Sequence, residues 1–419
     1  MATGSEVSGA KSVPVPPLEY ETHRWQPRYP ALFSRAEVAR QTGDYESAVP
    51  QRIAAWAPAL TADLAADVVD ASAALVSFDA HTVTVLGAED PALGPMASIL
   101  LRTESASSSQ IEQLTVSARQ LALAELDQSD RANARTVVGN VRAMEAALRL
   151  SDALDAASIL AMQRELLLAQ PGYEEHAGAF RDELVWIGNR DTAGPRGAEF
   201  IAPQHPLIRP AIDDMLAFVA RDDLPALVQI AVAHAQFETI HPFVDGNGRT
   251  GRALAQAMLR AKGLATHATV PLSAGLLTDT EGYFADLQTF RSGDAGPIIR
   301  RFAAAARYAA ATGRVLVDDL RGELERSRSQ LEGLRSQAAA WRVLPILIGQ
   351  PVVNARYLQT ALGLSEMTAL RALAALTERG VLVERTGQAR NRIWQHPGIL
   401  DVLDSYAAAI RRAAIRPGR

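Results

Sequence analysis

The chain has 419 residues, of which 48% are hydrophobic, a formal net charge of -5 and no cysteine. This length and hydrophobic content suffice for two or three hydrophobic cores, so we expect a multidomain globular protein rather than a disordered chain. The negative charge argues against a chain that coats nucleic acid or membranes without specificity, and the lack of cysteine excludes disulfides, thiolate metal sites and cysteine nucleophiles.

The first 100 residues predict a short leader followed by helices. Residues 1–17 carry three prolines among Gly, Ser and Val, which predicts a flexible leader. From Pro58 onward, Ala- and Leu-rich stretches separated by polar breaks predict successive helices, and we expect residues 18–100 to form an N-terminal helical region. The sequence shows no signal-peptide core and no uninterrupted apolar run long enough to span a bilayer, so we expect a cytoplasmic protein with no membrane partner.

A short β-prone run interrupts the helical pattern near the middle of the chain. Residues 184–187 are followed by Gly, Asn, Asp and Pro and then by Phe200-Ile201, which predicts a hairpin with a long tip. The strand edge formed by Val185, Trp186 and Ile187 could pair with an extended segment of a target protein. The alternative is a simple core hairpin.

The most specific signal is the segment 241–252, which reads HPFVDGNGRTGR. Apolar residues of the preceding segment, 224–240, share one helical face, and Pro242 disfavours the α conformation for His241, so the helix should end there. The glycine-rich loop then runs into a second helix. Backbone N–H groups and the helix dipole therefore converge on the loop and form an anion cradle.

The residue types in this segment fit phosphate chemistry. Arg249 and Arg252, three residues apart, can neutralise a polyphosphate. Asp245 is the only acidic side chain of the loop and is the best candidate to hold Mg²⁺ beside phosphate oxygens. His241 can accept a proton from an attacking hydroxyl near neutral pH. Each residue alone has an ordinary structural explanation, but the combination within twelve residues favours an active site.

The segment 241–252 matches the Fic family signature H-P-F-x-[D/E]-G-N-G-R-x-x-R in full, and the sequence therefore resembles that family. The resemblance implies an α-helical Fic core over residues 101–310 with a β-hairpin flap. It implies that His241 is the catalytic base and Asp245 the Mg²⁺ ligand. The implied nucleotide-binding residues are Gly246, Asn247, Gly248, Arg249, Arg252 and Tyr283.

Two further segments resemble the family more weakly. Residues 178–187, with Gly-x-Phe-Arg followed by Val-x-Ile, resemble the flap hairpin that binds the target protein. Tyr283 and Phe284 resemble the stretch that lines the nucleotide-base pocket, where family members often carry two tyrosines. The phenylalanine would remove one hydrogen-bonding group from that pocket.

Ser108 and Glu112 resemble the inhibitory helix that some Fic proteins carry ahead of the core, with the pattern [S/T]-x-x-x-E-[G/N]. The two residues are one helical turn apart and share a face. The resemblance implies a salt bridge from Glu112 to Arg252 that removes a contact of the γ-phosphate. Gln113 stands where the family prefers Gly or Asn, and the alternative is an ordinary capping box that begins at Ser109.

The C-terminal quarter predicts a separate small domain. Residues 311–340 carry apolar residues at helical spacing and predict a connecting helix. In residues 341–396, two short helices followed by a small hairpin predict a winged-helix domain, and residues 397–419 are expected to be a C-terminal tail.

The predicted winged helix has two candidate partners. Between Trp341 and His396, seven Arg against three Glu give a local balance of +4, which favours contact with phosphates. DNA would then meet Arg371 on the recognition helix, with Arg390 and Arg392 on the wing. Docking of a protein is the alternative.

The function favoured by these features is a protein adenylyltransferase that moves AMP from ATP to a Ser, Thr or Tyr hydroxyl of a protein and is self-inhibited through Glu112. The alternatives are a nucleotide-sensing, DNA-binding transcription regulator and a Fic enzyme that transfers another phosphate-containing group or removes AMP. A pure binding function would not require His241. The expected cofactor is Mg²⁺, with ATP as co-substrate. The expected partners are an unidentified target protein, the chain itself through automodification, DNA at the winged helix, and a second copy in a homodimer.

Overall fold

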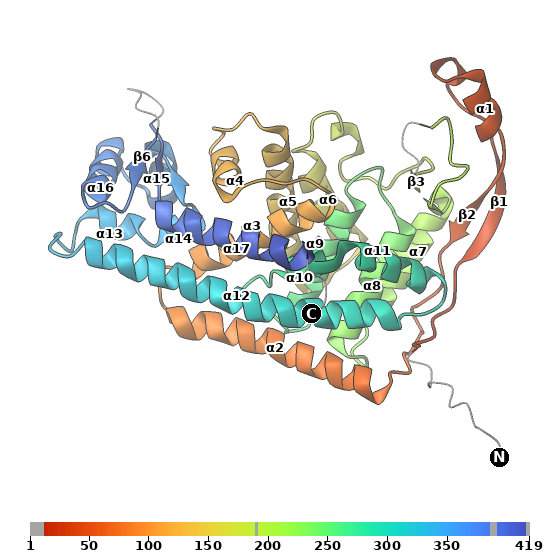
Figure 1. The fold of residues 1–419 in the computed structure, drawn as a ribbon, viewed down its shortest axis with the longest axis horizontal. Coiled ribbons are helices and arrows are strands. Elements are labelled where there is room, and N and C mark those ends of the chain that lie inside the picture. The colour runs from red at the N-terminus through yellow and green to blue at the C-terminus, as the bar shows by residue number, and fades with distance from the viewer. Residues whose placement is uncertain (1–11, 189–191, 386–391, 416–419) are drawn as a thin grey trace.

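The computed structural model describes residues 12–188, 192–385 and 392–415, and helices dominate it (Figure 1). The prediction of a mainly α protein is therefore confirmed. In chain order the elements are β1 (Glu19–Trp25), α1 (Arg35–Gln41), β2 (Gly43–Val49), α2 (Ala62–Leu86), α3 (Leu93–Ile111), α4 (Ala118–Glu125), α5 (Ala132–Arg149), α6 (Ala156–Leu167), β3 (Trp186–Ile187), β4 (Phe200–Ile201), α7 (Ile208–Val219), α8 (Ala226–Ile240), α9 (Asn247–Ala261), α10 (Leu272–Leu276), α11 (Thr280–Arg291), α12 (Gly296–Gln330), α13 (Ala339–Val343), α14 (Ile346–Gly349), β5 (Val352–Val353), α15 (Ala355–Leu362), α16 (Glu366–Glu378), β6 (Val383–Glu384), β7 (Trp394–Gln395) and α17 (Pro397–Ile415).

Helix α8 is the centre of the core. Its sequence, ALVQIAVAHAQFETI, is apolar on nearly every face, and all its residues from Leu227 to Ile240 are buried. A helix that is apolar all round must be surrounded by other elements, and α7, α9, α11 and α12 all pack against α8. The residues that follow its C-terminal end are thereby held on a rigid support.

Helices α2 and α12 lie side by side along one edge of the molecule (Figure 1). A Cβ atom at Gly313 of α12 would lie 2.8 Å from the ring of Phe78, so glycine permits this close approach. Arg307 of α12 forms an ion pair of 3.3 Å with Asp67 of α2. By length and composition alone, α2 is apolar enough to cross a membrane, with a third of its most apolar window buried, but Asp67, Asp70 and Asp79 interrupt it, so the prediction of no uninterrupted apolar run is not overturned.

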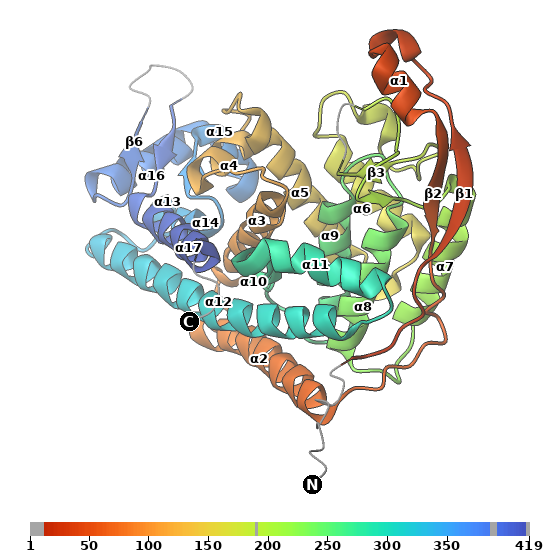
Figure 2. The ribbon, with the colours of Figure 1, turned by 45° about the vertical axis from the view of Figure 1, so that its right-hand side comes forward.

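The predicted helical region 18–100 instead begins with a long β-hairpin. Strands β1 and β2 pair antiparallel over seven residues, from Glu19–Val49 to Trp25–Gly43, and α1 lies at the far end of the hairpin (Figure 2). Strand β1 is largely exposed, whereas β2 is partly buried at Ser47 and Ala48, and both strands lack the alternating apolar pattern that marks a half-buried strand. Helices α2 and α3 confirm the helical prediction for the rest of this region.

The described part of the predicted leader is packed against the core. Val13 and Val15 are buried, and the backbone N–H of Val13 donates to Asp294 at 2.8 Å. Residues 1–11 lie outside the described residues, so the prediction of a flexible leader is wrong only for its last part.

The C-terminal module contains the predicted elements in the predicted order. Helices α15 and α16 are joined at Gly363, which adopts a φ of +63°, a conformation that glycine allows at little cost. Strand β5 precedes α15, strands β6 and β7 follow α16, and the three form an antiparallel sheet in the order β5-β7-β6. Whether this module acts as a winged helix stays a prediction.

Two boundaries differ from those predicted. The connecting helix over 311–340 is not separate, because α12 begins in the core at Gly296 and continues without a break to Gln330. The C-terminal tail is helical over Pro397–Ile415 and packs back on α12 and α4. The buried side chains Ile399, Leu403 and Ile410 recur at helical spacing, a pattern that identifies this segment as an amphipathic helix.

Candidate active site

The motif 241–252 forms the turn between α8 and α9, as predicted. His241 ends α8 in the left-handed conformation, with φ 48° and ψ 60°. This conformation is rare for a residue with a side chain and is found where the surrounding structure enforces it, often at functional sites. Gly246 is also left-handed, with φ 81°, and α9 begins at the next residue, Asn247. The first N–H groups of α9 therefore point into the loop without intrahelical acceptors.

Two side chains hold this turn in shape. Asn247 donates its Nδ2–H to the carbonyl oxygen of Phe243 and accepts the N–H of Phe243 on Oδ1, both at 2.9 Å. Its side chain thus closes the loop, and Asn247 also lines the cavity above the turn, so its contact with phosphate stays a prediction. Arg181 donates its Nε–H to the carbonyl oxygen of His241 at 2.8 Å.

A cavity of about 550 Å³ opens over the turn. Its lining brings together nine of the predicted site residues, which come from α8, α9, α11, the end of α3 and the hairpin. They are Glu112, Ile187, His241, Asp245, Gly246, Asn247, Gly248, Arg252 and Tyr283. Ser108 and Arg249 do not line it but contact residues that do.

Glu112 bridges the two motif arginines. Its Oε1 accepts a hydrogen bond from Arg252 Nη2 at 2.7 Å, as predicted, and its Oε2 lies 2.8 Å from Arg249 Nε. The second contact is an ion pair without good hydrogen-bond alignment. A Cβ atom at Gly248 would lie 2.5 Å from Glu112 Oε1, so the carboxylate rests on the first turn of α9. It therefore lies where an anion is attracted by the helix N-terminus and both arginines.

The end of α3 explains the sequence around Glu112. Ser108 accepts the Nε–H of Arg252 on its hydroxyl at 2.8 Å and the Nη2–H on its carbonyl at 2.9 Å. Ser109 is buried near the C-terminal end of α3, so the alternative of a capping box at a helix start is wrong. Gln113 has a φ of +65°, a left-handed conformation that Gly and Asn adopt most easily. This explains why those two residues are preferred there.

Asp245 has one carboxylate oxygen that is bound and one that is available. Oδ2 accepts hydrogen bonds from Gln170 Nε2 at 2.6 Å and Arg249 Nη2 at 3.2 Å, whereas Oδ1 has no partner among the described residues. The described residues hold no group of three or more His, Asp or Glu that could bind a metal by themselves. A cation here would take its remaining ligands from phosphate and water, as Mg²⁺ commonly does.

The two histidines of the site are neutral at physiological pH. Burial, followed by the charges of Arg291 and Arg181, lowers the pKa of His241 to about 3. Its Nδ1 is buried and has no hydrogen-bond partner among the described residues. Burial and the charge of Arg252 lower the pKa of His234 to about 3 as well. A neutral ring keeps one nitrogen lone pair free, so His241 can accept a proton.

The remaining wall of the cavity carries Glu238 and Tyr283. Burial raises the pKa of Glu238 to about 7, partly offset by the charge of Arg252, and its Oε1 has no hydrogen-bond partner among the described residues. The hydroxyl of Tyr283 lies 2.7 Å from His234 Nε2, so it already has a polar partner inside the protein. Phe284 is 49% exposed and lines the mouth of the cavity.

The predicted flap hairpin exists as strands β3 and β4. Trp186 pairs with Ile201, and Ile187 pairs with Phe200. Of the three predicted flap residues, only Ile187 lines the cavity. Val185 packs in a small core cluster, and the Trp186 ring packs edge-on against Trp25 of β1 at 5.7 Å. The hairpin thus has features of both predicted alternatives. Val185 packs in a core, as in a simple core hairpin, and Ile187 borders the site, as in a target-binding flap.

Sequence reasoning missed three supports of the site. Gln170 contacts both Asp245 and Arg249, and no local pattern signals it because it lies about 75 residues before the motif. Arg291 donates to the carbonyl oxygen of Glu238 at 2.9 Å and lies 3.7 Å from the ring centroid of Phe200. The role of Arg181 in holding His241 was also missed, although the Gly-x-Phe-Arg pattern signalled that residue.

The arginines of the C-terminal module are partly engaged inside it. Arg392 pairs with Glu384 and lies 4.7 Å over the ring of Trp394, and Arg390 lies outside the described residues. Arg371 is exposed on α16, beside Met367, which is 62% exposed. This face combines positive charge with apolar surface, so it leaves DNA binding and protein docking as alternatives.

Several known proteins are similar to this chain. Residues 153–259 match the model of the Fic/DOC family. The chain is 30% identical over 145 residues to protein adenylyltransferase fic-1 of Caenorhabditis briggsae and 28% identical over 166 residues to that of Caenorhabditis elegans. These matches cover 34% and 38% of this chain but only 25% and 30% of the two relatives.

Solved structures with a similar arrangement include a Fic family protein from Desulfovibrio desulfuricans G20 and Fic-1 from C. elegans. The first is 21% identical with a TM-score of 0.43, over 77% of this chain and 95% of that chain. The second is 21% identical with a TM-score of 0.44, over 60% of this chain and 73% of that chain.

Proposed function

The chain belongs to the Fic/DOC family, and on this premise we propose that it is a protein adenylyltransferase that moves AMP from ATP to a hydroxyl of a protein and is held inactive by Glu112. The observation that carries the proposal is the single cavity wall formed by His241, Asp245, the start of α9 and Arg252. A neutral base, a free carboxylate oxygen and a cationic helix N-terminus are the groups that nucleotidyl transfer needs.

The proposed reaction is a displacement at the α-phosphorus of ATP. The target hydroxyl oxygen bonds to that phosphorus, the bond to the α,β-bridging oxygen breaks, and pyrophosphate leaves. His241 accepts the hydroxyl proton, because its ring is unprotonated before the reaction. Arg181 holds the backbone of His241 and thereby fixes the direction of the ring.

The phosphates would bind at the N-terminus of α9. Backbone N–H groups there, together with Arg252 and Arg249, favour negative charge. Asp245, through its available Oδ1, would hold Mg²⁺, which neutralises phosphate charge when bound. The target segment would lie beside Ile187, the flap residue that borders the cavity.

Inhibition is supported by the position of Glu112. The carboxylate lies on the first turn of α9 and neutralises the two arginines that a triphosphate would use. Both arginine side chains are only 3% exposed, so they have little freedom to find another anion while Glu112 remains in place. ATP would then bind without its γ-phosphate contact and in an unproductive position.

The direct test uses the purified full chain with Glu112→Gly and nucleotides labelled at the α-phosphate. Incubation with labelled ATP, UTP or CTP, followed by electrophoresis, should show label on the chain itself with ATP. ATP labelled at the γ-phosphate is the control and should give none. Label from γ-labelled ATP would indicate phosphoryl transfer, and label from UTP or CTP alone would indicate another transferred group; either result would contradict the proposal.

A further inference from the structure

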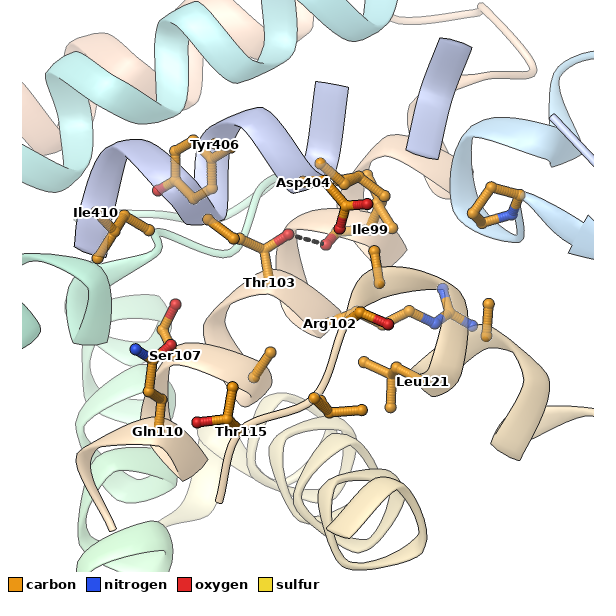
Figure 3. A pocket seen from close by; sticks show the side chains of 18 of the residues that line it. Ile99, Arg102, Thr103, Ser107, Gln110, Thr115, Leu121, Asp404, Tyr406 and Ile410 are labelled. Atoms are coloured by element: carbon orange, nitrogen blue, oxygen red, sulfur yellow. Dashed lines mark hydrogen bonds between the residues drawn. The ribbon is translucent and has the colours of Figure 1, made fainter. Parts of the chain in front are cut away.

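A second cavity lies behind the helix that carries Ser108 and stops just before Glu112. It has a volume of about 420 Å³ and is enclosed by α3, by α4 with the segment before it, and by the C-terminal helix α17 (Figure 3). We call it the rear cavity. None of its lining residues lines the active-site cavity. Its volume is within the range of about 300–1,000 Å³ that is typical of small-molecule sites.

Helix α3 separates the rear cavity from Arg252. Successive residues of an α-helix are turned by about 100°, so Ser108 and Glu112 point in nearly the same direction, toward Arg252. Thr103, Ala106 and Gln110 line the rear cavity and are turned by about 140° to 160° from Ser108. The two cavities therefore lie on opposite sides of the same helix.

Arg252 donates to the backbone carbonyl oxygen of Ser108 as well as to Glu112, so its full release would move the end of α3 away from α9, toward the rear cavity. Along its flank, α3 is already anchored, because Asn140 donates to the carbonyl oxygen of Ser105 at 2.8 Å. Glu104 accepts the hydroxyl of Ser273 at 2.7 Å. A molecule that fills the rear cavity would block this movement. Such a molecule fits the cavity of the conformation in which Glu112 contacts Arg252. Its binding would therefore shift the equilibrium between the inhibited and active conformations toward the inhibited one.

The lining defines the chemistry of such a molecule. Ile99, Leu121 and Ile410 are apolar residues of the lining. At one end, the side chains of Ser107 and Gln110 gather, and they form no hydrogen bond with the described residues (Figure 3).

The charges around the rear cavity disfavour an ionic ligand. Arg102 is neutralised by Glu125, whose two oxygens both lie 2.7 Å from its Nε. Asp404 and Arg411 oppose each other in charge at the rim. Because these charges cancel in pairs, the lining has no net charge to compensate a buried ion. The rear cavity therefore prefers a neutral ligand.

We propose that the rear cavity binds a neutral, largely apolar small molecule with one hydroxyl or amide end, and that this ligand strengthens inhibition by Glu112. The regulatory part rests on the proposed function; the binding part does not.

Binding is tested on the full chain with 1-octanol as the probe. The variant Ala407→Trp places an indole in the rear cavity from α17, and Ala409→Trp places one on the exposed face of the same helix as a control. Saturating 1-octanol should raise Tm by on the order of 2 °C or more in the wild type and in Ala409→Trp. In Ala407→Trp the shift should be lost. An equal shift in all three proteins, or none in the wild type, would overturn the proposal. If Ala407→Trp does not fold, Ala106→Leu takes its place.

Regulation is tested by automodification with labelled ATP. In Ser108→Ala, where Arg252 loses one hydroxyl contact, 1-octanol should lower the rate at least threefold, whereas in Glu112→Gly it should have no effect. Octanol that binds without slowing Ser108→Ala would overturn the regulatory part. No transfer by Glu112→Gly at any octanol concentration would instead refute the proposed function, because the Tm shift would still report binding.

Discussion

Replacement of Glu112 by glycine should release the active site. Glu112 makes one well-aligned, charge-assisted hydrogen bond to Arg252 at 2.7 Å and one ion pair to Arg249. A charge-assisted bond contributes about 1.5–3 kcal/mol. Taking about 2 kcal/mol for the aligned bond alone, and tenfold per 1.4 kcal/mol, the inhibited conformation is favoured by roughly 30-fold. The variant should therefore automodify with ATP roughly 30-fold faster than the wild type.

Initial rates of label transfer from α-labelled ATP, compared at equal protein concentration, would measure this gain. Ser109→Ala is the matched control, because Ser109 lies three residues away on α3 and accepts a hydrogen bond from Asn140 at 3.1 Å, without contacting the arginines. It should lower the free energy of unfolding by about 1 kcal/mol and leave the rate unchanged. No gain for Glu112→Gly, in protein shown by circular dichroism to be folded, would mean that Glu112 has a structural role only.

Other changes test separate parts of the account. In the Glu112→Gly background, Arg252→Ala should weaken ATP binding at least tenfold, and a calorimetric titration with unchanged affinity would remove this arginine from the phosphate site. Burial raises the pKa of Glu104 from 4.5 to about 7, so its contribution to stability is full below pH 4.5 and is lost as the pH rises toward 7. Glu104→Gln should flatten the pH dependence of the unfolding free energy over this window by on the order of 3 kcal/mol, measured by denaturant titration; an unaltered slope would show that the carboxyl is not perturbed. The C-terminal module should bind DNA at most moderately and less tightly at high salt. A gel shift unaffected by Arg371→Ala would favour protein docking instead.

The turn between α8 and α9 was the most predictable part of the molecule. Its residues are adjacent in sequence, so local rules place them: Pro242 ends α8 after His241, and the glycines admit the left-handed turn before α9. The contact between Glu112 and Arg252 spans 140 residues, yet family resemblance located it because Ser108 and Glu112 form a local pattern of their own.

The parts that sequence reasoning missed depend on contacts between distant segments. Strands β1 and β2 carry mostly charged and polar residues, so no apolar alternation marks them. Gln170 is an ordinary loop residue until the fold brings it to Asp245. The side chain of Asn247 could equally face a phosphate or close the loop, and only the structure shows its two bonds to Phe243.

If His241 is the base for AMP transfer, its removal should abolish transfer without loss of ATP binding, and a paired measurement can separate the two effects. Label from α-labelled ATP is followed on Glu112→Gly and on the double variant with His241→Ala, while calorimetry reports ATP affinity for both. The double variant should bind ATP with similar affinity, because His241 acts on the hydroxyl and the start of α9 holds the phosphates, but it should transfer no label. Comparable labelling rates in the two proteins would contradict the role of His241 as the base.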